Sequence, residues 1–169
     1  MRWLRIGAFL LLPMAVVADD WGPLEFLIGQ WTGQGSGSPG TGAGAFSFTP
    51  DLQRRILVRK SFAEYPPAGG KPAFRHDDLL IVYREVTAAA IRAIYFDNEG
   101  HVIRYNVEAA ANQAVFTSEG SRNEPRYRMT YRAAGPNQLG FRFEIAEPGK
   151  DLVRYIDAVL QREAPAQAK

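Results

Sequence analysis

The chain has 169 residues, of which 46% are apolar, and it contains no cysteine. One domain with a substantial core fits this length. The apolar content excludes a chain that is disordered throughout, and the lack of cysteine excludes disulfides, cysteine-ligated metals, thiol nucleophiles and lipid attachment through cysteine. The formal net charge is +2 with basic residues spread among acidic ones, which excludes the basic run typical of nucleic-acid-binding segments.

The first 18 residues have the layout of a secretory signal peptide. Arg2 and Arg5 precede an almost unbroken apolar run at residues 6–17, and small residues lead to Ala18 before the acidic Asp19. That run is shorter than the roughly 20 residues of a membrane-spanning helix. We therefore expect cleavage after Ala18, a secreted or periplasmic protein, and no stable membrane insertion after cleavage. Cleavage would remove two arginines and no acid, which leaves a formally neutral chain.

Residues 23–35 predict a short helical turn that leads into a first strand. Pro23 suits the first turn of a helix, and residues 27–35 carry Trp31 in an extended pattern. Residues 35–45 are mostly glycine, serine and alanine, a composition typical of a flexible loop. Residues 35–40 match G-x-G-x-x-G, but a strand rather than a helix is expected next, so the match does not predict a dinucleotide site.

The rest of the chain has the pattern of short strands separated by turns. Residues 65–75 form a predicted long loop with three prolines, and residues 97–100 form a hairpin turn that ends in Gly100, a residue that tolerates positive φ. The predicted strands cover residues 45–49, 54–64, 76–85, 88–96, 101–109, 113–119, 126–133, 139–145 and 152–162. We therefore predict an all-β protein, a closed antiparallel meander barrel of about ten strands with one short N-terminal helical turn.

The C-terminal part leaves one alternative open. Leu152, Ile156 and Leu160 would also share one face of a helix, so a helical segment is the alternative to a last strand. We expect the barrel domain to cover residues 19–163 and residues 164–169 to form a disordered tail.

Alternating aromatic side chains give the candidate ligand site. In a closed barrel the apolar face of a strand points inward, and charged neighbours such as Arg128 and Glu144 face water. An inner wall of aromatic and thioether side chains suits a flat, mostly apolar ligand with one or two hydrogen-bonding groups. The predicted ligand-binding residues are Trp31, Tyr83, Tyr95, Tyr127, Met129, Tyr131, Phe141, Phe143 and Tyr155. In the alternative, these side chains simply fill the barrel.

The two histidines do not make a convincing catalytic or metal site. His76 and Asp78 would share one face of a strand, but a metal site needs further ligands, and His101 adjoins a turn. No Gly-x-Ser-x-Gly motif marks a nucleophilic serine. We assign no catalytic residue and no metal ligand. An enzyme in which His76, Asp78 or an inward arginine–carboxylate pair acts on a hydrophobic substrate stays open.

Residues 29–33, Gly-Gln-Trp-Thr-Gly, resemble the Gly-x-Trp opening of the lipocalin-like (calycin) barrels. The resemblance implies that Trp31 closes one barrel end under an arginine from a late strand, Arg154 or Arg162. Residues 94–105 resemble the central hairpin of a family of secreted bacterial lipocalin-like domains of unknown function. The opening is also similar to that of the nitrobindins, ten-stranded barrels that bind haem through a histidine near the C-terminus. No histidine follows His101 here, so we expect no haem and no other cofactor.

Three functions follow as hypotheses. The leading one is a secreted or periplasmic barrel that binds a small apolar or aromatic molecule in its interior. The others are a barrel enzyme that acts on a hydrophobic substrate and a structural or partner-binding module without a ligand. An apolar cavity would favour binding, an interior polar cluster would favour an enzyme, and a filled barrel with an exposed apolar patch would favour a module. A nucleic acid partner is not expected in any of them.

Overall fold

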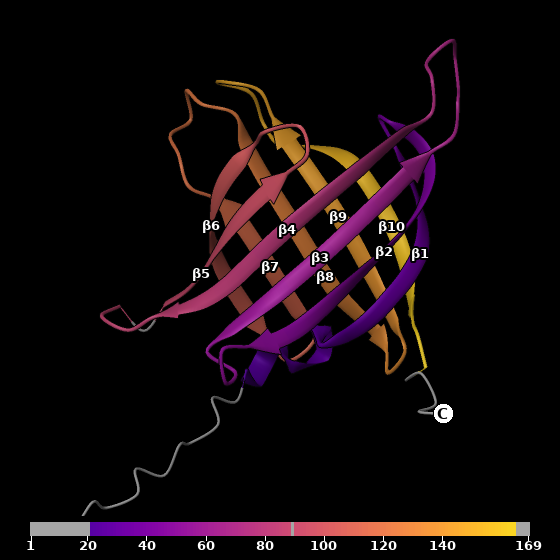
Figure 1. Ribbon diagram of the computed structural model, residues 1–169. Helices are drawn as coiled ribbons and strands as arrows, with labels where there is room; N and C mark the ends of the chain where they lie inside the picture. Colours follow the sequence, from indigo (N-terminus) through magenta and orange to yellow (C-terminus); the bar gives the residue numbers. More distant parts are fainter. Residues whose placement is uncertain (1–20, 89, 165–169) are drawn as a thin grey trace, which may run out of the picture.

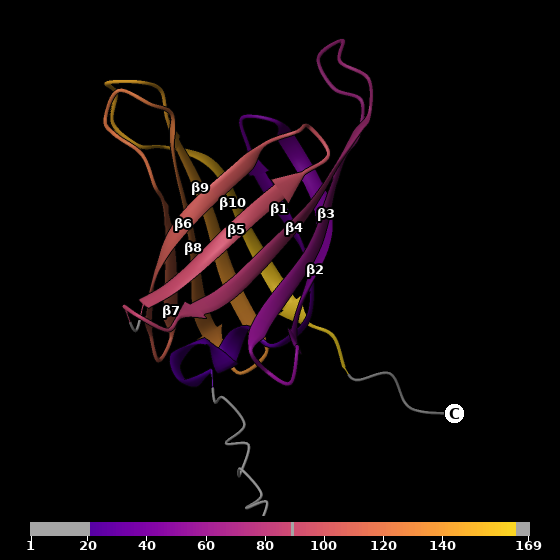
Figure 2. The same ribbon diagram turned by 60° about the vertical axis from the view of Figure 1, so that its left-hand side comes forward.

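The computed structural model describes residues 21–88 and 90–164, and they form one closed barrel of antiparallel strands. Each strand pairs with the strands before and after it in the chain, and β1 pairs with β10 to close the ring. Figures 1 and 2 show this ring from two sides, with the strands tilted against the barrel axis. The predicted all-β meander barrel is confirmed. The expected signal peptide at residues 1–18, and all of the expected tail except Ala164, lie outside the described residues.

One short helix precedes ten strands. The elements are η1 Gly22–Leu27, β1 Gly29–Gly37, β2 Gly40–Asp51, β3 Ile56–Tyr65, β4 Phe74–Glu85, β5 Ala90–Asp97, β6 Val102–Ala110, β7 Gln113–Ser118, β8 Arg126–Gly135, β9 Gln138–Ala146 and β10 Val153–Arg162. The predicted last strand at residues 152–162 is β10, Val153–Arg162, and the helical alternative is wrong. Among the described residues, no helix is long and apolar enough to cross a membrane.

The 3-10 helix η1 closes one end of the barrel, which appears as the lower end in Figure 1. Leu24 and Leu27 are fully buried against the barrel interior. The indole Nε1 of Trp31 donates a hydrogen bond to the carbonyl oxygen of Leu27 at 2.9 Å. The guanidinium of Arg162 lies 4.1 Å from the centre of the Trp31 ring. Arg162, and not Arg154, is thus the late-strand arginine over the tryptophan.

The structure corrects the prediction of a flexible loop at residues 35–45. This stretch is a tight hairpin, because β1 continues to Gly37 and β2 begins at Gly40. Neighbouring backbones lie so close that a Cβ on Gly37 would be 1.9 Å from the carbonyl oxygen of Tyr155, and one on Gly44 would be 2.4 Å from that of Phe62. The glycines are therefore needed for close strand packing, which composition alone does not distinguish from flexibility.

The apolar core fills the half of the barrel next to η1. Tyr131 lies at its centre, with its ring 5.7 Å from each of the rings of Phe46, Phe48 and Phe116 in edge-to-face contacts. Such contacts are the preferred geometry of packed aromatic pairs. This half of the barrel is solid, and any ligand has to lie in the other half.

Candidate functional site

A cavity of about 360 Å³ occupies the half of the barrel opposite η1. Inward-facing residues of most strands line it, and Pro39, Phe74 and Glu99 lie around its mouth. These three residues belong to the β1–β2, β3–β4 and β5–β6 connections or their flanks, which lie at the upper end of the barrel in Figure 1. The cavity therefore opens at the end of the barrel that η1 does not cover.

On three strands from two sides of the barrel, β3, β8 and β9, the cavity ends where the packed core begins. Arg59 lines it on β3, Met129 on β8 and Phe141 on β9. The inward residue two positions nearer to η1 is fully buried and outside the lining on each of these strands: Leu57, Tyr131 and Leu139. A single layer of side chains thus separates the solid half from the hollow half and forms the cavity floor.

A buried ion pair lies in this floor. The guanidinium of Arg59 donates from Nη2 to the carboxylate of Asp78 and from Nη1 to the hydroxyl of Tyr131 on the far side of the barrel. Both charged side chains are almost fully buried, at 4% and 6% exposed. Burial alone would lower the pKa of Arg59, but the negative charge of Asp78 and its hydrogen bond with Arg59 outweigh burial, so the pKa is raised. Arg59 is therefore charged at any physiological pH.

His76 forms a second polar group between the floor and the mouth. Its Nδ1 lies 2.8 Å from Oε1 of Glu99, and its Nε2 lies 2.8 Å from the hydroxyl of Tyr95. A neutral imidazole that donates from Nδ1 to the carboxylate accepts at Nε2 from the phenol. Burial, with the charge of Asp78 as the next cause, raises the pKa of Tyr95, so the phenol keeps its proton and is able to donate it to Nε2 of this tautomer.

Tyr105 contributes a hydroxyl that no described residue satisfies. It lines the cavity, is 1% exposed, and has no hydrogen-bond partner among the described residues. Its ring makes edge-to-face contacts with Tyr95 at 6.5 Å and with Phe116 at 6.4 Å. Burial raises its pKa above the ordinary value of 10.0 despite the opposing charge of Arg59. The group is therefore a protonated phenol that faces the cavity from its floor.

The structure brings six of the nine predicted ligand-binding residues to the cavity wall. They are Tyr95, Tyr127, Met129, Phe141, Phe143 and Tyr155. Tyr131 lies directly below the floor and accepts a hydrogen bond from Arg59. Trp31 lies at the closed end under Arg162, and Tyr83 lies on the outer face of β4, because it alternates with the inward, buried Val82. Neither of these last two contacts the cavity, so their predicted role is corrected.

Sequence reasoning missed Arg59 and Tyr105 as parts of the site. In β3 the apolar Ile56, Val58 and Phe62 alternate with Arg59, so the pattern favours the wrong face as the inner one. From the sequence, Asp78, its partner, is a candidate only for an enzyme or a metal site. Tyr105 could have been predicted from the sequence to face inward, because it alternates with the polar Arg104 and Asn106, which are exposed in β6.

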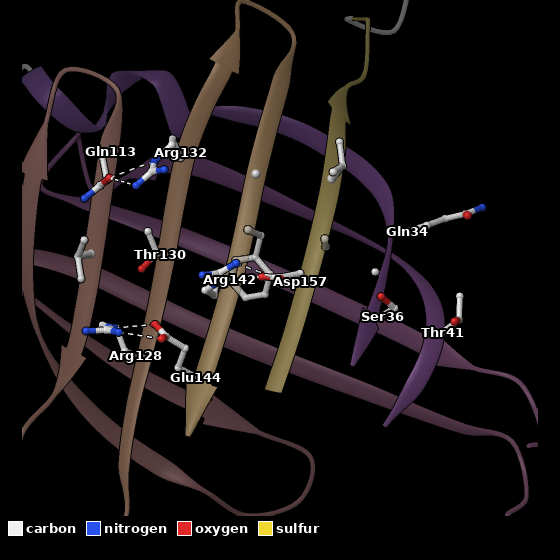
Figure 3. A pocket seen from close by; sticks show the side chains of 16 residues that line it. Gln34, Ser36, Thr41, Gln113, Arg128, Thr130, Arg132, Arg142, Glu144 and Asp157 are labelled. Carbon is white, nitrogen blue, oxygen red and sulfur yellow. Dashed lines mark hydrogen bonds and ion pairs between the residues drawn. The ribbon is translucent and has the colours of Figure 1, made fainter. Parts of the chain in front are cut away.

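A second hollow lies on the outer face of β7–β10, β1 and β2, and is shown in Figure 3. It forms where Gly140 has no side chain between Arg132 and Arg142. Four of its charged side chains form two ion pairs, Arg128 with Glu144 at 2.6 Å and Arg142 with Asp157 at 2.7 Å, and Arg132 donates to Gln113 at 2.8 Å. It is an open surface groove whose charges are already satisfied, so the interior cavity is the candidate site. No group of three metal-ligating side chains occurs in residues 21–88 and 90–164.

Comparison with known proteins identifies the fold alone. No protein-family model matches the chain, and no curated protein matches it. The crystal structure of Rv2717c from M. tuberculosis has a TM-score of 0.59 at 14% sequence identity, over 83% of this chain and 95% of that one. The structure of EF1p2_mFAP2b bound to DFHBI has a TM-score of 0.39 at 13% identity, over 83% of this chain and 97% of that one.

Proposed function

We propose that this protein binds a small, mostly apolar molecule inside its barrel. The observation that carries the proposal is the cavity itself, about 360 Å³ of space above a floor that continues into a packed core. Small-molecule sites range from roughly 300 to 1,000 Å³, so this cavity suits a compact ligand such as a bicyclic aromatic.

The cavity wall supports an aromatic ligand. The rings of Tyr127 and Phe143 stack at 6.2 Å with an angle of 8° between their planes. Tyr155 meets Phe143 edge-on at 6.0 Å. Together with Phe141, these side chains offer ring faces and edges to a flat ligand.

A titration with an uncharged fluorescent probe, N-phenylnaphthylamine, tests the proposal. We expect one probe per barrel with Kd in the micromolar range, roughly −8 kcal/mol. Phe143→Arg should abolish binding while the protein stays folded, because its side chain enters the cavity. Val102→Arg is the matched control, since Val102 is 62% exposed on the outer strand face. If the parent binds no probe, or if Phe143→Arg binds it as well as the parent, ligand binding is wrong.

A barrel enzyme is the second candidate, because Glu99, His76 and Tyr95 form a carboxylate–imidazole–phenol chain in the cavity wall. Both ring nitrogens of His76 already have protein partners, which leaves none for a substrate and ranks binding first. Hydrolysis of naphthyl acetate by the parent and by His76→Asn tests the enzyme. Turnover well above the buffer rate that His76→Asn loses would favour catalysis, and buffer-level rates would exclude this hydrolysis.

We further propose that the ligand is not haem. His76 is engaged through both nitrogens, and His101, whose Nδ1 lies 2.8 Å from Asp97, is 53% exposed at the cavity mouth rather than enclosed by the cavity. The sequence has no later histidine and no cysteine to supply an axial ligand. Titration with haemin should give no sharp Soret band. A sharp band at one equivalent that His101→Ala removes would contradict this proposal.

We propose that the protein acts outside the cytoplasm, after cleavage at Ala18. The basic start and apolar run of residues 1–18 support this. Intact-mass measurement of the exported protein should give a chain that begins at Asp19. An exported product that retains Met1 would contradict cleavage.

A further inference from the structure

We propose that the ligand is uncharged and carries one hydrogen-bond acceptor beside an aromatic body, and that the Tyr105 hydroxyl donates to this acceptor. This inference rests on the proposed function and names the class of ligand. An aryl ketone is the simplest molecule of the class.

Two donors at the cavity floor have no acceptor in the described part of the chain: Nε of Arg59, which is buried, and the hydroxyl of Tyr105, which is open to the cavity. Leaving a buried polar group unsatisfied costs folding stability, so native proteins rarely retain one without a reason. A ligand acceptor that reaches the floor would satisfy the Tyr105 hydroxyl, which already faces the cavity.

The floor calls for an acceptor rather than a donor. Burial raises the pKa of Tyr105, so its phenol is protonated. Arg59 has only donors, and its charge acts on the Tyr105 hydroxyl. In the Asp78 carboxylate, Oδ1 accepts from Arg59 and Oδ2 lies 3.8 Å from Nε2 of His76.

The charges around the cavity disfavour an ionised ligand of either sign. Asp78 already balances the charge of Arg59, and Asp97 and Glu99 add negative charge to the wall. A carboxylate would therefore enter a site with no unpaired cation, and would lose its hydration there. An ammonium group has only donors, so it could not accept from the Tyr105 hydroxyl, and it too would lose its hydration. An uncharged acceptor avoids both costs and still forms the hydrogen bond.

A matched ligand series tests the inference by displacement of N-phenylnaphthylamine. The four competitors are the naphthyl methyl ketone, ethylnaphthalene, naphthoate and naphthylmethylammonium, all substituted at the same ring position. We expect the ketone to bind roughly 5- to 10-fold more tightly than ethylnaphthalene, the value of one neutral hydrogen bond. Both charged compounds should bind more weakly than ethylnaphthalene.

The substitution Tyr105→Phe isolates the proposed donor. It removes one oxygen atom, so ketone affinity should fall to that of ethylnaphthalene while ethylnaphthalene affinity stays unchanged. Tyr83→Phe, on the outer face of β4, is the control and should change neither affinity. The inference is overturned if naphthoate or the ammonium compound binds as tightly as the ketone, or if Tyr105→Phe weakens ketone and ethylnaphthalene equally. Failure of the probe and of all four competitors to bind would instead refute ligand binding itself.

Discussion

Arg59 and Asp78 form an ion pair inside the barrel, at the boundary between its packed half and its hollow half. They come from the adjacent strands β3 and β4, where Arg59 is paired with Leu80 and Asp78 with Ser61. A buried charge is tolerated when it is paired and hydrogen-bonded, and the loss of one partner leaves the other exposed to the full cost of burial. The pair therefore holds a polar surface in place where the core ends.

A double-mutant cycle on this pair should show strong coupling. We expect Asp78→Leu to reduce the free energy of unfolding by about 3–5 kcal/mol, because it leaves the Arg59 cation unpaired. Adding Arg59→Met should restore part of that loss, since the double variant buries no charge. Urea denaturation of the parent, both single variants and the double variant measures the coupling. Losses that simply add would show that the two side chains do not depend on each other.

The barrel could be predicted from the sequence because its turns and alternations are local signals. Tyr127, Met129 and Phe143 alternate with charged residues, and the structure places all three in the cavity wall. Arg59 could not be placed in the same way, because its strand has apolar residues on both faces. Its inward position depends on Asp78 and Tyr131, 19 and 72 residues away in the chain. A hollow barrel and a filled barrel have the same alternation of apolar and polar residues. The presence of the cavity could therefore be recognised only from the three-dimensional packing of the side chains.

Two glycines in different surroundings should respond differently to alanine. A Cβ on Gly33 would lie 2.2 Å from a backbone oxygen of β10, whereas a Cβ on Gly140 would meet nothing nearer than 3.9 Å. Gly33→Ala should therefore destabilise the protein by more than about 2 kcal/mol, because strands have to separate. Gly140→Ala should be neutral or stabilising by up to about 1 kcal/mol. Thermal unfolding of both variants and of the parent measures these changes in stability. Equal losses of stability in the two variants would contradict the close strand packing at Gly33.

Trp31 should be a major contributor to stability at the closed end. It is 1% exposed and is held by Leu27 through a hydrogen bond and by Arg162 through its ring face. Trp31→Ala should cost about 3–5 kcal/mol of unfolding free energy, the usual range for a buried large aromatic residue. Trp31→Phe should cost less because it keeps most of the buried area. A Trp31→Ala protein as stable as the parent would show that this end is not packed as described.

The outer ion pair Arg128–Glu144 should make stability depend on pH in the acid range. Two hydrogen bonds from Arg128 to the carboxylate lower the pKa of Glu144 below its ordinary value of 4.5. The folded state therefore binds this proton more weakly than the unfolded state does. The pair's contribution is complete above about pH 4.5 and is lost as pH falls through the folded-state pKa.

The substitution Glu144→Gln tests this dependence. It should cost about 0.5–1 kcal/mol at neutral pH, the usual value of a partly exposed pair, and the difference from the parent should shrink as pH falls below 4.5. Glu108→Gln, at an exposed position on the outer face of β6, is the matched control. Urea denaturation at pH 3, 4, 5 and 7 gives the comparison. A difference that stays constant with pH would contradict the role of the pair.

A crystal structure of the mature protein with bound N-phenylnaphthylamine tests the central claim most directly, because it locates the ligand. We predict density for one probe inside the barrel, above the layer of Arg59 and Met129 and against Phe143, with the core around Tyr131 unchanged. Density only in the outer groove over Gly140, or an interior filled by side chains with no probe, would contradict the account.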